Sequence, residues 1–174
     1  MERKHNEKNA KEEIKVYKAS REIEKHEAFV EIISKAYNAT ESVCKSYPNY
    51  FIWYWKKVVP DILTGTRDVI IIMFNEEVAG VAIVKKKDDE RKLCTVYVEP
   101  NYRDREITTK LLEEAFSFLG TTKPLISISE EKLDMFQGII KKYNWKKTQV
   151  LPEGYYNENS REIVFNGFIK LNNT

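Results

Sequence analysis

The sequence has few of the residues from which metal sites, disulfide frameworks and charge-driven interfaces are built. Its 174 residues include only two cysteines and two histidines. Cys44 and Cys94 lie far apart in the chain, and His5 and His26 belong to no ligand pattern, so no metal site is predicted. Both cysteines are instead expected to fill space as small buried side chains.

Charge of one sign and long apolar runs are also missing. Lys and Arg number 29 against 27 Asp and Glu, which leaves a formal net charge of +2. A nucleic-acid partner usually requires a strongly basic domain, so none is expected. No apolar run approaches the roughly 20 residues that span a membrane, and the charged start MERKHNEKNAKEE does not resemble a secretory signal. These absences predict a cytoplasmic protein with no membrane partner.

The apolar pattern predicts a polar tail over residues 1–12 and a single domain over residues 13–174. The expected order is strand, two helices, three strands, helix, strand, helix and two strands. Strands are expected at 13–19, 67–75, 76–86, 92–98, 124–128, 145–151 and 162–171, and helices at 20–37, 50–63, 103–119 and 130–143.

Local signals set several of these boundaries. Ser20 and Ser129 are expected to cap helices, and Gly120 to end one. Residues 75–77 form the short connection of a predicted hairpin. In the helix at 50–63, which Pro60 disturbs near its end, the apolar spacing predicts one buried face. That face consists of Phe51, Tyr54, Trp55, Val58, Val59 and Ile62.

A strand, a right-handed helical crossover and a second strand over residues 98–127 predict one parallel pair in an otherwise antiparallel sheet. The predicted class is therefore α/β (α+β), with a mixed, mostly antiparallel central sheet and helices on both faces. The crossover helix begins at the carboxyl end of its strand, where such sheets usually bind a ligand.

The stretch VEPNYRDREITTKLL, residues 98–112, forms this strand-to-helix junction. A helix start of this kind offers free backbone N–H groups to a phosphate. Together with the element order, V-x-P-x-Y-R followed by I-x-x-K-L-L-x-x-A-F resembles the GNAT superfamily of N-acetyltransferases. The later stretch from Phe136 through Lys141-Lys142-Tyr143-Asn144-Trp145 resembles that family's late helix and following strand, so the likeness extends from about Glu13 to Leu171.

The resemblance implies that acetyl-CoA binds as co-substrate, without a metal, in a V-shaped opening between the two parallel strands. Its pantetheine arm would pair with the strand at 95–98, and its pyrophosphate would lie on the loop that the family writes R/Q-x-x-G-x-G/A. The implied cofactor-binding residues are Val96, Tyr97, Val98, Arg103, Asp104, Arg105, Glu106, Ile107, Thr108 and Thr109.

Two residues of this loop depart from the family pattern. Glu106 and Thr108 occupy the positions of small residues, and Glu106 adds a negative charge beside a dianionic pyrophosphate. Arg103 and Arg105 supply compensating positive charge. The alternative is that Asp104 and Glu106 only cap the helix.

No catalytic residue can be assigned from the sequence. The tyrosine that protonates the leaving thiolate in many family members corresponds to Ile140 here, and Tyr143, one turn later, is expected in the core. The central strand carries no carboxylate to act as a base. Glu99, just beyond its end, is expected to be solvated; the alternative is that it acts as a base through a water molecule. Positioning the amine against the thioester would then supply much of the acceleration.

Exposed aromatic residues are the candidates for the acceptor site: Tyr50 and Trp53 in the second helix, and Tyr155 and Tyr156 before the last strand. Alternatively, they pack on each other or on a second copy of the chain in a homodimer. The predicted activity is acetyl transfer from acetyl-CoA to an unidentified small amine or peptide, by direct attack in a ternary complex. The alternative is a non-catalytic module of the same fold that senses CoA or binds a protein.

Overall fold

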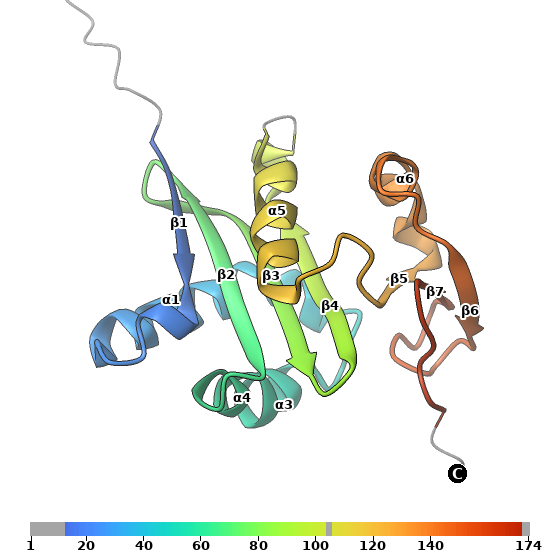
Figure 1. The fold of residues 1–174 in the computed structure, drawn as a ribbon, viewed down its shortest axis with the longest axis horizontal. Coiled ribbons are helices and arrows are strands. Elements are labelled where there is room, and N and C mark those ends of the chain that lie inside the picture. The colour runs from blue at the N-terminus through green and yellow to red at the C-terminus, as the bar shows by residue number, and fades with distance from the viewer. Residues whose placement is uncertain (1–12, 104–105, 172–174) are drawn as a thin grey trace, which may run out of the picture.

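Two antiparallel sheets form the frame of the protein in the computed structural model, which describes residues 13–103 and 106–171 (Figure 1). The first has the strand order β1-β2-β3-β4, and the second has the order β5-β7-β6. The strands are β1 (Ile14–Lys18), β2 (Arg67–Phe74), β3 (Glu77–Lys87), β4 (Glu90–Val98), β5 (Ile126–Ser129), β6 (Lys147–Leu151) and β7 (Glu162–Phe165).

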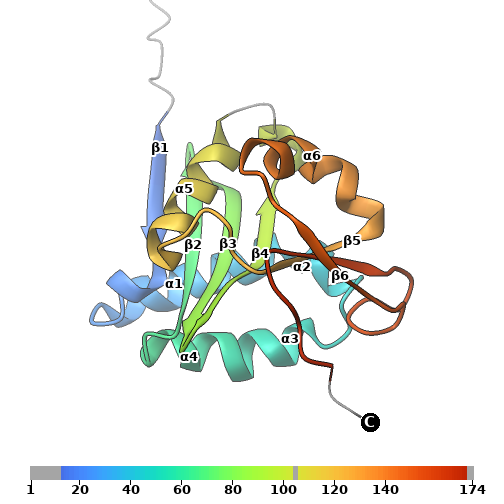
Figure 2. The ribbon, with the colours of Figure 1, turned by 45° about the vertical axis from the view of Figure 1, so that its right-hand side comes forward.

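Helices cover both faces of the first sheet, as predicted. Helix α5 packs on one face, and α1, α3 and α4 lie on the other, while α6 accompanies the second sheet (Figures 1 and 2). The helices are α1 (His26–Ala39), α2 (Glu41–Cys44), α3 (Tyr50–Trp53), α4 (Val59–Leu63), α5 (Ile107–Leu119) and α6 (Leu133–Lys142). Short turns of 3-10 helix are η1 (Ala19–Arg21), η3 (Pro100–Tyr102) and η4 (Glu130–Lys132). None of the helices in the described part of the chain has the length and apolar character of a membrane span.

Strand β2 is buried along its whole length because helices cover both of its faces. Ile70 and Ile72 face α5, whereas Val69 and Ile71 face the helices on the opposite side. A strand that is covered twice has no solvent face, so its sequence is a nearly continuous apolar run instead of an alternating one. The connection to β3 is a tight turn with positive φ at Asn75 and Glu76, in agreement with the predicted hairpin.

Gly80 in β3 allows α5 to lie close to the first sheet. A Cβ atom at this position would lie 3.2 Å from Ile107 Cγ2 and 3.3 Å from both Leu111 Cδ2 and the Tyr97 carbonyl oxygen. Any other residue would therefore have to displace the first turns of α5, or the β4 backbone, by a few tenths of an ångström.

The predicted buried face of the helix at 50–63 is confirmed for Tyr54, Val58 and Ile62, but it is wrong at its first position. The fully buried residues are Tyr50, Tyr54, Val58 and Ile62, at regular intervals of four, whereas Phe51 is 57% exposed. The segment Tyr54–Val58 (η2) is π-helical, and its wider turn changes which side chains face the sheet. This wide turn directly precedes Pro60, whose ring cannot fit against a regular preceding turn.

Three further predictions need correction. The Ser129 side chain makes no capping hydrogen bond to η4, the turn that follows it. Ser20 does not cap α1, which begins at His26; its backbone N–H and its hydroxyl both donate to the buried Asp68 carboxylate, at 3.0 and 2.6 Å. The last strand ends at Phe165, and residues 166–171 continue without regular structure. The predicted tail at 1–12 lies outside the described residues.

The expected parallel strand pair is reduced to one bridge, between Lys92 of β4 and Leu125 just before β5. Two backbone hydrogen bonds form it: the Leu93 N–H donates to the Leu125 carbonyl, and the Leu125 N–H donates to the Arg91 carbonyl. Beyond this point β4 stays with the first sheet and β5 joins the second. The two sheets therefore diverge from a single contact.

Candidate functional site

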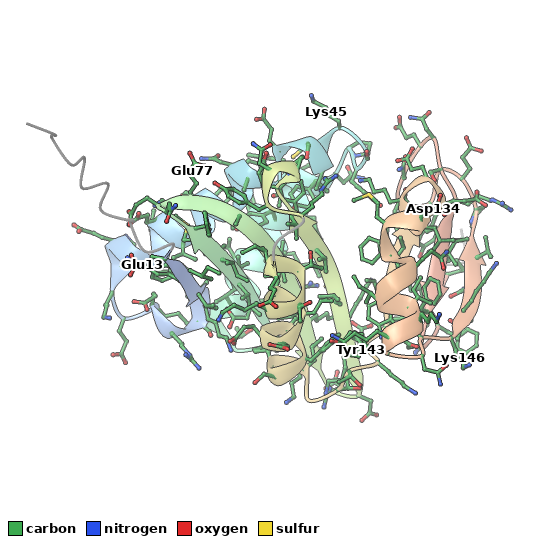
Figure 3. The ribbon with its side chains drawn as sticks, turned by 90° about the horizontal axis from the view of Figure 1, so that it is seen from above. Glu13, Lys45, Glu77, Asp134, Tyr143 and Lys146 are labelled. Atoms are coloured by element: carbon green, nitrogen blue, oxygen red, sulfur yellow. The ribbon has the colours of Figure 1, made fainter. Side chains whose placement is uncertain are left out.

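A cleft of about 1020 Å³ opens where β4 and β5 separate. Its walls come from β4, β5 and α3, from the loop before β7, and from residues 168–170 near the end of the described chain. In Figure 2 this last segment, in red, runs down past α3. Figure 3, seen from above, shows α6 and the second sheet standing apart from α5 and β4.

The edge of β4 that faces this cleft has no strand partner beyond Leu93 among the described residues. Opposite Ile83 and Val84 the ladder with β3 shifts register, and Cys94 is the extra, bulged residue on β4. Thr95 and Val96, which follow the bulge, line the cleft. Their strand edge therefore offers backbone groups to an extended ligand.

The strand-to-helix junction lies at the other end of β4. The Arg103 side chain donates from Nε to the Val98 carbonyl, at 3.1 Å, which holds the loop against the strand end. Glu106 precedes α5 with a φ of −66°, so its backbone conformation does not require glycine. Asp104 and Arg105 lie outside the described residues.

The side chain of Glu106 does not cap α5. It is exposed and makes no hydrogen bond to the N–H groups of the first turn. Ile107 is fully buried beneath the helix start, whereas Thr108 is half-buried and Thr109 exposed. For Glu106, the capping alternative that the sequence allowed is therefore wrong, and the N–H groups of this turn receive no side-chain acceptor from it.

All four acceptor-site candidates line the cleft, although they come from segments far apart in the chain. The prediction that Tyr50 is exposed is wrong. Tyr50 is buried, and its hydroxyl donates to Thr40 Oγ1 at 3.0 Å. Trp53 is half-buried, with its ring 5.4 Å from that of Tyr50. Tyr155 and Tyr156 contact each other edge to face, with centroids 4.7 Å apart.

A buried carboxylate that the sequence did not single out lies behind this wall. Glu162 of β7 is 1% exposed, and its Oε1 accepts a 2.6 Å hydrogen bond from the Tyr47 hydroxyl. Burial raises the pKa of Glu162, and the hydrogen bonds from Tyr47 and Ser127 and the charges of Lys132 and Lys92 only partly offset this rise. Tyr47 itself lines the cleft, and burial together with this hydrogen bond raises its pKa above the ordinary value.

Charged residues also line the cleft floor. The Arg67 side chain is 4% exposed; its Nε pairs with Asp61 Oδ2 at 2.9 Å, and its Nη1 donates to Cys94 Sγ at 3.3 Å. The guanidinium lies 5.5 Å from the centre of the Trp53 ring. The prediction that Cys94 only fills space as a small buried side chain is wrong, because the residue is half-buried and lines the cleft. One feature of the sequence could have indicated these buried charged residues, because Arg67 and Asp68 begin an otherwise apolar strand.

The residues considered for proton transfer in the sequence lie elsewhere. Tyr143, labelled in Figure 3, packs edge to face on Phe116 of α5 with centroids 5.0 Å apart, and is a packing residue as predicted. Ile140 packs against the same cluster. Glu99 is not simply solvated: it is half-buried and accepts a hydrogen bond from the Tyr97 hydroxyl at 2.9 Å.

Comparison with protein families gives one match: residues 26–122 fit the sequence profile of the acetyltransferase (GNAT) family. The matched segment runs from the start of α1 to just beyond α5 and includes the first-sheet strands β2–β4 and the strand-to-helix junction. No curated protein sequence matches the chain.

Solved structures share the fold at low sequence identity. A GNAT-family protein from Desulfovibrio desulfuricans superposes with a TM-score of 0.64 at 13% identity, covering 88% of this chain and 97% of its own. A GNAT-family acetyltransferase from Bacillus cereus gives 0.60 at 18% identity, with 88% and 95% covered. The PaiA N-acetyltransferase of Thermoplasma acidophilum, solved with coenzyme A, gives 0.56 at 16% identity, with 87% and 98% covered.

Proposed function

Because the chain belongs to the GNAT acetyltransferase family, we propose that it transfers the acetyl group of acetyl-CoA to an amine, by direct attack within a ternary complex. The observation that carries this proposal is the unpaired edge of β4 beside a cleft of about 1020 Å³. This arrangement gives a thioester and an amine a common site, and holding two reactants together is a large source of acceleration.

Acetyl-CoA would enter along β4. The backbone of Val96, Tyr97 and Val98 would pair with the pantetheine arm, and the N–H groups at the start of α5 would receive the pyrophosphate, with Arg103 beside them. The coenzyme A complex of the PaiA N-acetyltransferase, a protein of the same fold, supports this assignment of the cofactor.

The acceptor would bind on the α3 side of the cleft, among Tyr50, Trp53, Tyr155 and Tyr156. Its amine must lose a proton before it attacks the thioester. The pair of Tyr47 and Glu162 suits this step, because the hydroxyl lines the cleft and donates to a carboxylate whose pKa is raised. An ammonium acceptor gives up two protons in all. One leaves to solvent before the attack, and the other passes to the tyrosine oxygen as the C–N bond forms, while the tyrosine proton passes to Glu162. The same path returns this proton to the thiolate as the C–S bond breaks.

Calorimetric titration of the purified protein with acetyl-CoA tests the cofactor half of the proposal, and release of free thiol with a panel of amines tests the catalytic half. Heat on binding and amine-dependent thiol release are expected. The absence of both binding heat and a thermal shift would refute the proposal.

A second candidate, a non-catalytic module that binds CoA without transferring its acetyl group, is favoured by two observations. Glu106 places a carboxylate at the pyrophosphate loop, and Ile140 stands where many family members carry an acidic tyrosine. Binding of CoA with no thiol release from any amine would support this candidate over the enzyme.

Replacing Glu106 by glycine is expected to tighten acetyl-CoA binding about fivefold, since a screened repulsion at about 4 Å is worth on the order of 1 kcal/mol. Glu106→Gln removes the charge and keeps the bulk, so the two variants separate repulsion from backbone access. Glu113→Gln makes the same charge change on an exposed position further along α5 and is expected to leave affinity unchanged. Unaltered or weaker binding by Glu106→Gly would mean that the carboxylate does not face the pyrophosphate.

A further inference from the structure

Three cationic residues lie side by side across the first sheet on the cleft floor. Arg67 of β2 is the register partner of Lys85 of β3, and Lys85 is in turn the partner of Lys92 of β4. Register partners in adjacent strands present their side chains on the same face, with strands about 4.8 Å apart. All three residues line the cleft, so they form one row, the cationic row, beneath it.

Like charges directly opposite each other destabilise a sheet unless they are compensated. Two members of the row have partners: Arg67 pairs with Asp61, and Lys85 with Glu90 at 2.6 Å. Burial would raise the pKa of Glu90, but the surrounding Lys85, Lys92 and Arg67 outweigh it and lower the pKa.

Lys92 is the member of the row with no ion-pair partner among the described residues. Its ammonium group lies 5.5 Å from the centre of the Tyr156 ring, at the apex where β4 and β5 meet. Lys57 and Lys170, which also line the cleft, have no carboxylate partner in the described chain either. Glu162 lies behind the cleft wall outside these ion pairs, and it accepts a hydrogen bond from Tyr47. The floor therefore keeps an excess of positive charge.

This charge does not serve the phosphates of CoA. The pyrophosphate loop follows the carboxyl end of β4, whereas Lys92 lies six residues before Val98, which corresponds to about 20 Å along an extended strand. Between them lies the stretch of β4 assigned to the pantetheine arm. The cationic row is thus on the acceptor side of the site, on the same face as Trp53.

We propose that the acceptor is a small primary amine that carries a carboxylate or phosphate group, bound by Lys92 together with Arg67 and Lys85. The inference rests on the proposed acetyl transfer and names its substrate class. The anionic group binds the row, and the amine then lies toward Tyr47 and Glu162. A small molecule fits better than an acidic polypeptide, because residues 168–170 line the cleft and are held there by two hydrogen bonds between Gln149 and Ile169.

Matched amine pairs test this proposal through thiol release from acetyl-CoA. The pairs are 4-aminobutyrate against butylamine for a carboxylate, and phosphoethanolamine against ethanolamine for a phosphate; spermidine serves as a cationic acceptor. In at least one pair the anionic amine is expected to have a kcat/KM at least tenfold above its neutral partner, with spermidine the poorest, and added salt is expected to reduce the preference. The pair with the larger ratio identifies the anion.

Lys92→Gln tests the assignment to the row. At a pH where Glu162 is ionised with or without Lys92, we expect it to lower kcat/KM for the preferred anionic amine at least tenfold more than for its neutral partner, and to leave the Kd of acetyl-CoA unchanged. Lys86→Gln, an exposed neighbour on β3 outside the cleft, is the control and should behave as the unaltered protein.

Three outcomes would overturn the inference: equal rates for charged and neutral amines, preference for spermidine, or acetylation of acidic peptides alone. Loss of acetyl-CoA affinity in Lys92→Gln would also overturn it, by assigning the lysine to the cofactor. Failure of acetyl-CoA to bind the unaltered protein would instead refute the proposed function, so the two failures are distinguishable.

Discussion

Replacing Glu162 by glutamine is expected to slow acetyl transfer about a hundredfold while the Kd of acetyl-CoA stays unchanged. General base catalysis by a positioned side chain contributes about 10²–10⁴-fold. Glutamine keeps the shape of the side chain and can still accept the hydrogen bond from Tyr47, but it cannot take up a proton. The measurement is single-turnover thiol release with saturating acetyl-CoA.

The pH profile distinguishes this role from a structural one. A base must be ionised to work, so kcat falls as the pH drops below the pKa of Glu162. Burial raises that pKa above the ordinary carboxyl value, with Lys92 and Lys132 opposing the shift. The fall of kcat on the acidic side is therefore expected at a pH above about 4.3, the ordinary pKa of a glutamate side chain. Glu162→Gln should lose this acidic limb of the profile.

Tyr47→Phe provides the matched variant, because it removes only the hydroxyl that links Glu162 to the cleft. If the pair acts as one relay, each single variant should cost about as much as the double variant. An unchanged acidic limb in Glu162→Gln, or losses that multiply in the double variant, would contradict the relay.

Replacing Gly80 by valine should affect both stability and cofactor binding. Valine places its Cβ and two methyl groups where Ile107, Leu111 and the Tyr97 carbonyl already lie within 3.3 Å. Overpacking of this kind typically costs 1–3 kcal/mol of the free energy of unfolding. Since Ile107 is the first residue of α5, the displaced helix start should also weaken acetyl-CoA binding, by more than tenfold. Chemical denaturation and calorimetry measure the two effects.

Two further glycine variants serve as controls for this prediction. Gly80→Ala adds only the Cβ and should give a smaller loss of the same kind, which can be measured even if Gly80→Val fails to fold. In α6, a Cβ at Gly138 would meet nothing within 4 Å. Gly138→Ala should therefore raise stability by up to about 1 kcal/mol. Unchanged stability and affinity in Gly80→Ala would mean that α5 tolerates a side chain beneath it.

The features that the sequence predicted correctly depend on local patterns. The strands β2–β4, the helix α5 and its end at Gly120, with a φ of 70°, follow from runs of apolar residues and turn signals within a few positions. The strand-to-helix junction was recognisable for the same reason. It is one continuous stretch of chain.

The pair that we propose for proton transfer could not be predicted in this way. Tyr47 and Glu162 are 115 residues apart, and only the approach of the loop after α2 to the second sheet brings them together. The cationic row depends on strand register, which the positions of Arg67, Lys85 and Lys92 in the sequence do not specify. The error at the first position of the helix at 50–63, where Tyr50 and not Phe51 is buried, has another cause, because a π-helical turn breaks the 3.6-residue period on which the prediction relied.

The two sides of the protein are built differently, and this has a consequence for how its selectivity can change. On the α5 side one apolar cluster joins residues of both sheets, including Ile70 of β2 and Ile163 of β7, and so fixes the angle at which the sheets diverge. On the α3 side the cleft floor is formed by charged residues that belong to no apolar cluster. Exchanges at exposed or half-buried floor positions such as Lys92 leave that angle intact. Substitutions on the cleft floor can therefore change which acceptor binds during evolution, while the apolar cluster that stabilises the two sheets stays the same.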